Sequence, residues 1–70
     1  MVRTVVKVDG MMCSMCEAHI NDAIRRSFDV KKVKSNRKKK ETVIESAEPL
    51  DPQKVREAIE QTGYVFLGIE

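Results

Sequence analysis

Both cysteines of the chain lie in the stretch Gly10-Met11-Met12-Cys13-Ser14-Met15-Cys16, separated by two residues. Before it, residues 2–8 alternate between two faces, which predicts a half-buried strand. Behind it, Ser14 and Glu17 have the spacing of a capping box, which predicts a helix beginning near Met15. The stretch therefore stands where a strand changes into a helix, and we expect the rest of the chain to position it.

The helix after this stretch is predicted to bury one stripe of small and apolar side chains. The stripe consists of Cys16, Ile20, Ala23, Ile24 and Ser27. Asn21 and Asp22 lie on the opposite stripe and are expected to face water. Further along, 30–35 and 41–46 read as two strands, and the polar residues 36–40 between them read as a hairpin tip.

The second helix has clear signals at both ends. Asp51 is a suitable N-cap, Pro52 suits the first helical position, and Leu50 can pack onto Val55 as a hydrophobic staple. Gly63 is the expected stop. The buried stripe is expected to hold Val55, Ala58, Ile59 and Thr62. Residues 64–69 then read as a last apolar strand.

The resulting order is β-α-β-β-α-β. With right-handed crossovers this order gives an α+β, ferredoxin-like fold: a four-stranded antiparallel sheet with both helices on one face. Residues 1–70 are expected to form a single small domain. Tracing the strand directions places the two cysteines, the hairpin tip and Tyr64 at one end, with both termini at the far end.

Composition restricts the class of protein. No apolar run is long enough to span a membrane, so direct membrane insertion is not expected. The first residues are not a secretory signal, because Lys7 and Asp9 interrupt the apolar stretch at once. This favours a cytoplasmic protein, in which a CxxC pair is more typical of a metal or redox site than of a structural disulfide. A start at Met1 and an end after the last strand favour a free-standing chain.

Two thiolates at this spacing can close on one ion. The positive helix end favours the thiolate form of Cys13 and Cys16. A site with two soft ligands suits Cu(I) first, whereas structural Zn²⁺ prefers four ligands. Met12 and His19 are candidates for an additional ligand, although surface or packing roles are the simpler interpretation for both.

The quoted stretch resembles the GMxCxxC signature of the heavy-metal-associated (HMA) domain family, which includes copper chaperones and the metal-binding domains of copper-pumping ATPases. The resemblance extends through both helices to Gly63 and Tyr64. It implies a ferredoxin-like fold and Cys13 and Cys16 as the metal ligands. It also implies that Met11 supports the loop from the core and that Tyr64 lies beside the sulfurs without binding the ion. The chain departs from the family pattern at two places. It has Met12 where threonine or serine is usual, and Phe28-Asp29 where Pro-Gly is common.

The function expected from this resemblance is that of a cytoplasmic Cu(I) metallochaperone, not an enzyme. It would pass copper by thiolate exchange to a copper-transporting P-type ATPase or to its metal-binding domain. A carrier of Hg(II), Zn(II) or Cd(II) is the nearest alternative, and a homodimer bridged by a shared ion is also open. A thiol-disulfide redox protein is less favoured, because such proteins are longer and usually carry Trp or Pro beside the cysteines.

Residues 31–40 hold seven basic side chains and no acidic one, which leaves the rest of the chain at about −5. The segment is either a solvated hairpin or a surface that steers the chain toward an acidic partner. Nucleic acid is not an expected partner, because ferredoxin-like sheets bind RNA through aromatic residues on the central strands and this chain has none there.

Overall fold

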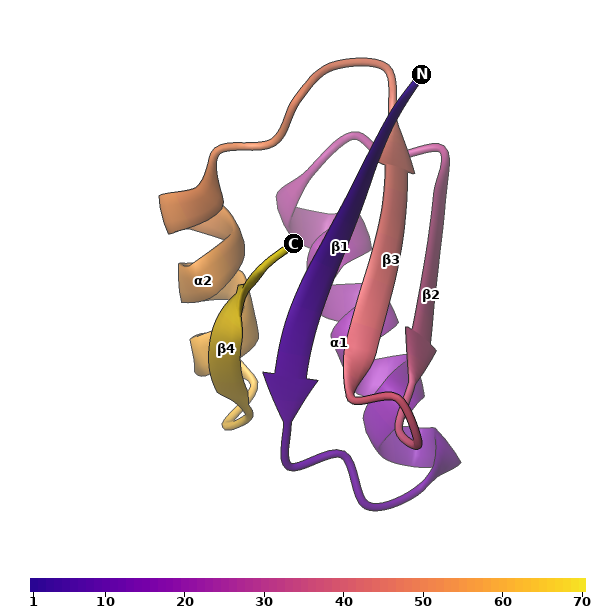
Figure 1. The fold of residues 1–70 in the computed structure, drawn as a ribbon, viewed down its shortest axis with the longest axis vertical. Helices are drawn as coiled ribbons and strands as arrows, with labels where there is room; N and C mark the ends of the chain where they lie inside the picture. The colour runs from indigo at the N-terminus through magenta and orange to yellow at the C-terminus, as the bar shows by residue number, and fades with distance from the viewer.

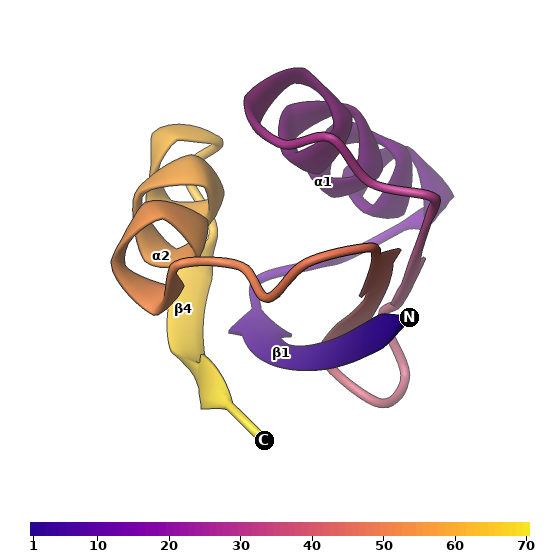
Figure 2. The ribbon, with the colours of Figure 1, turned by 90° about the horizontal axis from the view of Figure 1, so that it is seen from above.

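The computed structural model describes residues 1–70 and has the predicted order of elements. These are β1 (Val2–Asp9), α1 (Ser14–Ser27), β2 (Lys32–Asn36), β3 (Glu41–Ser46), α2 (Pro52–Gln61) and β4 (Val65–Ile69). The four strands form one antiparallel sheet in the order β2-β3-β1-β4. Both helices lie on one face of this sheet, and the other face is left open (Figures 1 and 2). The prediction of a ferredoxin-like α+β fold is confirmed.

The core lies between the sheet and the two helices. It is a cluster of Val6, Val8, Met11, Ile20, Ile24, Val33, Ile44, Val55, Ala58 and Ile59. The alternation expected for the strands is present, because Val6, Val8 and Ile44 are all fully buried. Burying each large aliphatic side chain contributes about 1.5–3 kcal/mol. Since Met11 belongs to the cluster, the base of the cysteine loop is part of the core.

A short polar network ties α1 to the sheet. The Ser35 hydroxyl donates to Asn21 Oδ1 at 2.7 Å and lies 2.9 Å from the Thr42 hydroxyl. Asn21 was expected to face water, and this expectation was wrong: its side chain is half-buried and satisfies the Ser35 hydroxyl. Buried polar groups need such partners, so the network fixes the helix that carries Cys16 against two strands.

The prediction of a capping box at the start of α1 is wrong. The helix begins at Ser14, its N-cap is Cys13, and no side chain caps it. The Glu17 carboxylate accepts a hydrogen bond from the backbone N–H of Arg37 at 2.8 Å instead of reaching back to its own helix end. At the other end Ser27, expected in the buried stripe, is exposed, and Phe28 packs against the core.

The start of α2 confirms its predicted signals. The Asp51 carboxylate accepts a hydrogen bond from the backbone N–H of Gln53 at 2.9 Å, and Pro52 is the first helical residue. Leu50 packs on the core cluster that contains Val55. Gly63 follows the helix with a φ of +89°, the left-handed conformation that glycine tolerates best.

The second strand begins at Lys32, two residues later than predicted, and Val30 instead packs against the core from the preceding loop.

No helix of the chain has both the length and the apolar character needed to cross a bilayer.

Three connections gather at one end of the molecule: β1–α1, β2–β3 and α2–β4 (Figure 1). The N-terminus lies at the opposite end, as predicted. The prediction is wrong for the C-terminus, which ends beside the middle of β1, where Glu70 N donates to Val5 O at 2.9 Å. The reason is length, because β4 has 5 residues and β1 has 8.

Candidate metal centre

The two cysteines are unbonded and close together. Cys13 has an extended backbone (φ −155°, ψ 176°) at the N-cap of α1, and Cys16 lies in the first helical turn. The backbone N–H of Cys16 donates to Cys13 O at 3.1 Å, and the two sulfurs are 3.7 Å apart. The Cys13 side chain is exposed, whereas Cys16 is half-buried against the core. The pair therefore combines an accessible sulfur with a sulfur held by the fold.

Gly10 shapes the approach to this pair. Its φ of +99° is a conformation that side chains rarely adopt, and a Cβ at this position would lie 3.4 Å from Cδ1 of Tyr64. The backbone N–H of Gly10 donates to Asp9 Oδ1 at 2.8 Å, which fixes the turn out of β1. The glycine thus allows the tyrosine ring to lie against the beginning of the cysteine loop.

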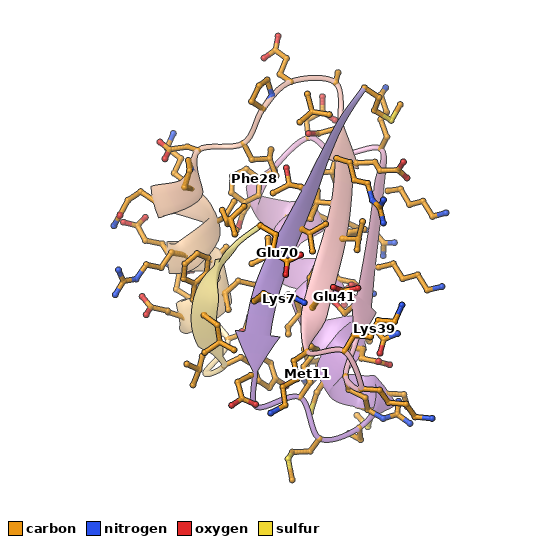
Figure 3. The ribbon with its side chains drawn as sticks, in the orientation of Figure 1. Lys7, Met11, Phe28, Lys39, Glu41 and Glu70 are labelled. Atoms are coloured by element: carbon orange, nitrogen blue, oxygen red, sulfur yellow. The ribbon has the colours of Figure 1, made fainter.

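The methionines of the loop differ in burial. Met11 is 8% exposed and belongs to the core, and Figure 3 shows it below the end of β1. Met12 is 84% exposed and Met15 is 67% exposed. Met11 is therefore buried at the base of the loop, whereas the thioethers of Met12 and Met15 are exposed.

Tyr64 and Cys16 form an electrostatic pair. Interaction with the Tyr64 hydroxyl, followed by interactions with backbone groups of Met12 and Cys13, lowers the pKa of the Cys16 thiol from 9.0 to about 7. Interaction with Cys16, together with desolvation, raises the pKa of Tyr64 to about 12. The phenol thus stays protonated and favours the thiolate, so a large fraction of Cys16 carries the charge that metal binding requires near neutral pH.

Acidic residues on both sides of the loop contact the hairpin tip. The Arg37 guanidinium lies 3.3 Å from Glu17 Oε1, and the Lys40 ammonium lies 3.6 Å from Asp9 Oδ1. Sequence reasoning placed the tip at this end of the fold but missed these pairs. The signal was present, because an acidic residue directly precedes and directly follows the stretch from Gly10 to Cys16.

The remaining basic residues of 31–40 include three that face the open side of the sheet. A hollow of about 340 Å³ on that side is lined by these three lysines and by Arg3, and also by two glutamates. The lysines are Lys32, Lys34 and Lys39, and the glutamates are Glu41 and Glu45. Nearby, the Lys7 ammonium lies 3.2 Å from Glu41 and 3.3 Å from Glu70 (Figure 3). The hydrogen bond to Glu41 is the main cause of the raised pKa of Lys7. This hollow does not include either cysteine.

His19 is exposed on α1. It lines a shallow hollow with Asp22, Arg26, Gln61 and Thr62. No group of three or more His, Cys, Asp or Glu side chains is arranged to hold an ion. The donor set that the structure brings together is therefore the pair of cysteine sulfurs.

Known proteins are similar to this chain in sequence and in fold. The model of the heavy-metal-associated domain matches residues 5–65. The copper chaperone CopZ of Enterococcus hirae is 38% identical over 58 residues, which cover 81% of this chain and 84% of that protein.

Solved structures of other proteins have the same fold as this chain. A CopZ metallochaperone superimposes with a TM-score of 0.85 at 19% identity, over 94% of this chain and 100% of the other. The yeast copper transporter domain CCC2A, solved in the apo and Cu(I)-loaded states, gives a TM-score of 0.84 at 25% identity, over 97% and 93% of the two chains.

Proposed function

The chain belongs to the heavy-metal-associated domain family, and from this premise we propose that it is a Cu(I) metallochaperone whose ligands are Cys13 and Cys16. One observation carries the proposal: two free thiols lie 3.7 Å apart at the start of a helix, with no third ligand beside them. Soft thiolates in low number suit Cu(I) better than Zn²⁺, which prefers four ligands. The names of the relatives, a copper chaperone and a Cu(I)-loaded domain, support the same ion.

The proposed transfer is ligand exchange without a redox change. A thiolate of the receiving protein binds the copper while both cysteines still hold it. The bond to Cys13 then breaks, because its sulfur is exposed and its backbone lies outside the helix, and the released thiolate takes up a proton. Cys16 leaves last, when a second thiolate of the receiving protein has bound the ion, since its sulfur is half-buried against the core.

The proposal includes a receiving protein and a cellular setting. The receiver is a copper-transporting P-type ATPase or its metal-binding domain, and the transfer takes place in the cytoplasm. Residues 1–70 act as one domain. The support is the likeness to a CopZ chaperone and to a yeast copper transporter domain.

The first prediction concerns the ligands. In competition with a Cu(I)-specific chelator, Cys13→Ser and Cys16→Ser should each lose tight copper binding, because one thiolate cannot chelate the ion alone. Ser14→Ala is the matched control, since Ser14 lies between the cysteines and its side chain makes no hydrogen bond to the helix end. It should bind copper like the parent.

Three results would count against the proposal. If the double variant Cys13→Ser/Cys16→Ser bound Cu(I) as tightly as the parent, Cys13 and Cys16 would not be the ligands. If anaerobic loading gave stoichiometric Zn(II), Cd(II) or Hg(II) in preference to Cu(I), the protein would be a carrier of that ion. Catalytic reduction of insulin would identify a thiol-disulfide enzyme instead.

A further inference from the structure

The two edge strands of the sheet, β2 and β4, differ in charge. An edge strand presents unpaired backbone N–H and C=O groups, and charged side chains commonly keep it from pairing with another chain. Strand β2 has Lys32 and Lys34, both exposed, whereas β4 has no charged residue. The β4 edge therefore lacks the protection that β2 has.

Strand β4 also exposes apolar side chains. Val65 and Leu67 are 55% and 56% exposed and Ile69 is 37% exposed, while Phe66 packs against the core. The other exposed large apolar side chains of the chain are all methionines: Met1, Met12 and Met15. Figure 2 shows β4 at the border of the sheet under α2, with no strand beyond it. Exposed apolar surface is thus gathered along an edge that can still form hydrogen bonds.

The register of the sheet shows which way the backbone of Phe66 points. Phe66 lies opposite Val8 in the pairing of β4 with β1. The Val8 N–H donates to Lys40 O at 2.9 Å, on the side of β3, and so points away from β4. Directly opposite residues of an antiparallel pair either bond to each other or both point away. The N–H and C=O of Phe66 therefore point out of the sheet edge.

Ile69 has the same orientation. Glu70 N donates to Val5 O at 2.9 Å, so Glu70 points toward β1 and the residue before it points outward. The outward residues Phe66 and Ile69 are thus three apart, because the register of β4 against β1 shifts between them. In a regular antiparallel strand the groups that face one side recur every two residues. A regular strand therefore matches only one of these two residues at a time.

We propose that two copies of this chain pair through β4, antiparallel and across a two-fold axis. Phe66 of each copy then lies opposite Ile69 of the other, so both outward residues find partners with the same spacing. A second copy has this irregular spacing by necessity, whereas a regular strand of another protein does not, so a second copy fits the edge better. In this register Glu70 lies opposite Val65, and no two like charges face each other along the strands.

The pairing places the two cysteine loops at opposite ends of one continuous sheet, because β4 runs in opposite directions in the two copies. Association therefore needs no metal ion and leaves both loops clear of the interface. This distinguishes it from a homodimer bridged by a shared ion. It also does not depend on the proposed function, so either proposal can fail alone.

The dimer is expected to be weak. Strand β4 has only 5 residues, and stable interfaces bury about 1,200–2,000 Å² in total. A pairing of this size fits a dissociation constant on the order of 0.1 mM. Helix α2 of each copy would lie beside α2 of the other, and its exposed side chains carry both signs of charge, which does not repel a second copy. These side chains are Lys54, Arg56, Glu57 and Glu60.

Sedimentation equilibrium of the reduced, metal-free protein tests the pairing. Between about 0.01 and 1 mM, the weight-average mass should rise about 1.5-fold by mass action. The double variant Cys13→Ser/Cys16→Ser should show the same rise, since its β4 is unchanged. Over the same range, hydrogen exchange at the backbone N–H groups of Phe66 and Ile69 should slow about fourfold, because pairing bonds them.

Leu67→Lys should keep the mass of a single chain at every concentration, because it gives β4 the kind of charge that β2 carries. The fold should tolerate the change, since the Leu67 side chain is more than half exposed and lies outside the core cluster. Met15→Lys is the matched control. Met15 is 67% exposed but lies on α1, so this variant should associate like the parent. Urea unfolding of both variants shows whether they are folded.

Three results would overturn the proposal. One is a mass that stays at that of a single chain up to about 1 mM. Another is association that disappears in Cys13→Ser/Cys16→Ser, which would identify a dimer held by an ion or a disulfide. The third is association that survives in Leu67→Lys or leaves exchange at Phe66 and Ile69 unchanged, which would place the contact on another surface. If Leu67→Lys does not fold, the exchange measurement on the parent decides alone.

Discussion

At the scale of single residues, the two cysteines of one motif have different surroundings. Cys13 is exposed at a helix end, and Cys16 is half-buried beside the Tyr64 hydroxyl. The sequence placed Tyr64 near the sulfurs through the tracing of strand directions and through the family resemblance. It could not show that the tyrosine acts on one cysteine in particular, because that depends on the fit of the ring against Gly10.

Tyr64→Phe should raise the pKa of Cys16 from about 7 toward its ordinary value of 9.0, because the variant removes the hydroxyl that favours the thiolate. The thiolate of the parent is stable in the folded chain above about pH 7, whereas the unfolded chain protonates it below about pH 9. This contribution to stability is therefore complete above about pH 9 and is lost as the pH falls through 7. The rate of alkylation of Cys16 against pH, in a Cys13→Ser background, measures the shift.

The reciprocal measurement checks the same interaction from the other side. Tyr64 is the only tyrosine and the chain has no tryptophan, so tyrosinate absorbance reports this group alone. Cys16→Ser should lower the pKa of Tyr64 from about 12 toward its ordinary value of 10.0. An unchanged tyrosine titration in this variant would show that the two side chains do not interact.

At the scale of elements, the two helices begin in different ways. Helix α2 has a side-chain cap from Asp51, and α1 has none. The bounds of β3 and the start of α2 follow from local signals and were predicted correctly. The capping box predicted for the start of α1 was wrong, because Glu17 bonds instead to Arg37, twenty residues away in the sequence. A rule that considers only neighbouring residues does not include such a contact.

Asp51→Ala should lower the free energy of unfolding by about 1 kcal/mol, because it removes the carboxylate that accepts from Gln53 N. Ser14→Ala is the matched change at the start of α1 and should leave stability almost unchanged, since the Ser14 hydroxyl caps nothing. Urea unfolding of the two variants measures the difference. An equal loss in both would mean that Ser14 caps α1 in solution after all.

At the scale of the whole molecule, one small core carries the fold. Natural domains have about 0.05–0.15 kcal/mol of stability per residue, so a chain of 70 residues has about 4–10 kcal/mol in total. The order of elements was sufficient to predict the sheet, the helix layer and the end at which the loops meet. The place of the C-terminus was not predictable, because it depends on how many residues β4 pairs with β1.

Ile44→Ala should lower the free energy of unfolding by about 2–5 kcal/mol, because it opens a cavity in the middle of the core. This is a large share of the total stability, and the transition should move to much lower urea concentration. Val43→Ala is the matched control on the same strand. Its side chain lies on the open face, half-buried, and the loss should be below that of Ile44→Ala.

The placement of the N-terminus has a practical consequence for handling the protein. The molecule measures about 30 × 22 × 19 Å, and the N-terminus lies at the end opposite the loop between β1 and α1 that holds Cys13 (Figure 1). A bead, a sensor chip or a fluorescent label attached to the α-amino group therefore leaves the sulfurs facing the solution. Attachment by random coupling to lysines has the opposite effect, because Lys38 and Lys40 lie in the β2–β3 connection, at the same end as the cysteines, and coupling there would cover the sulfurs.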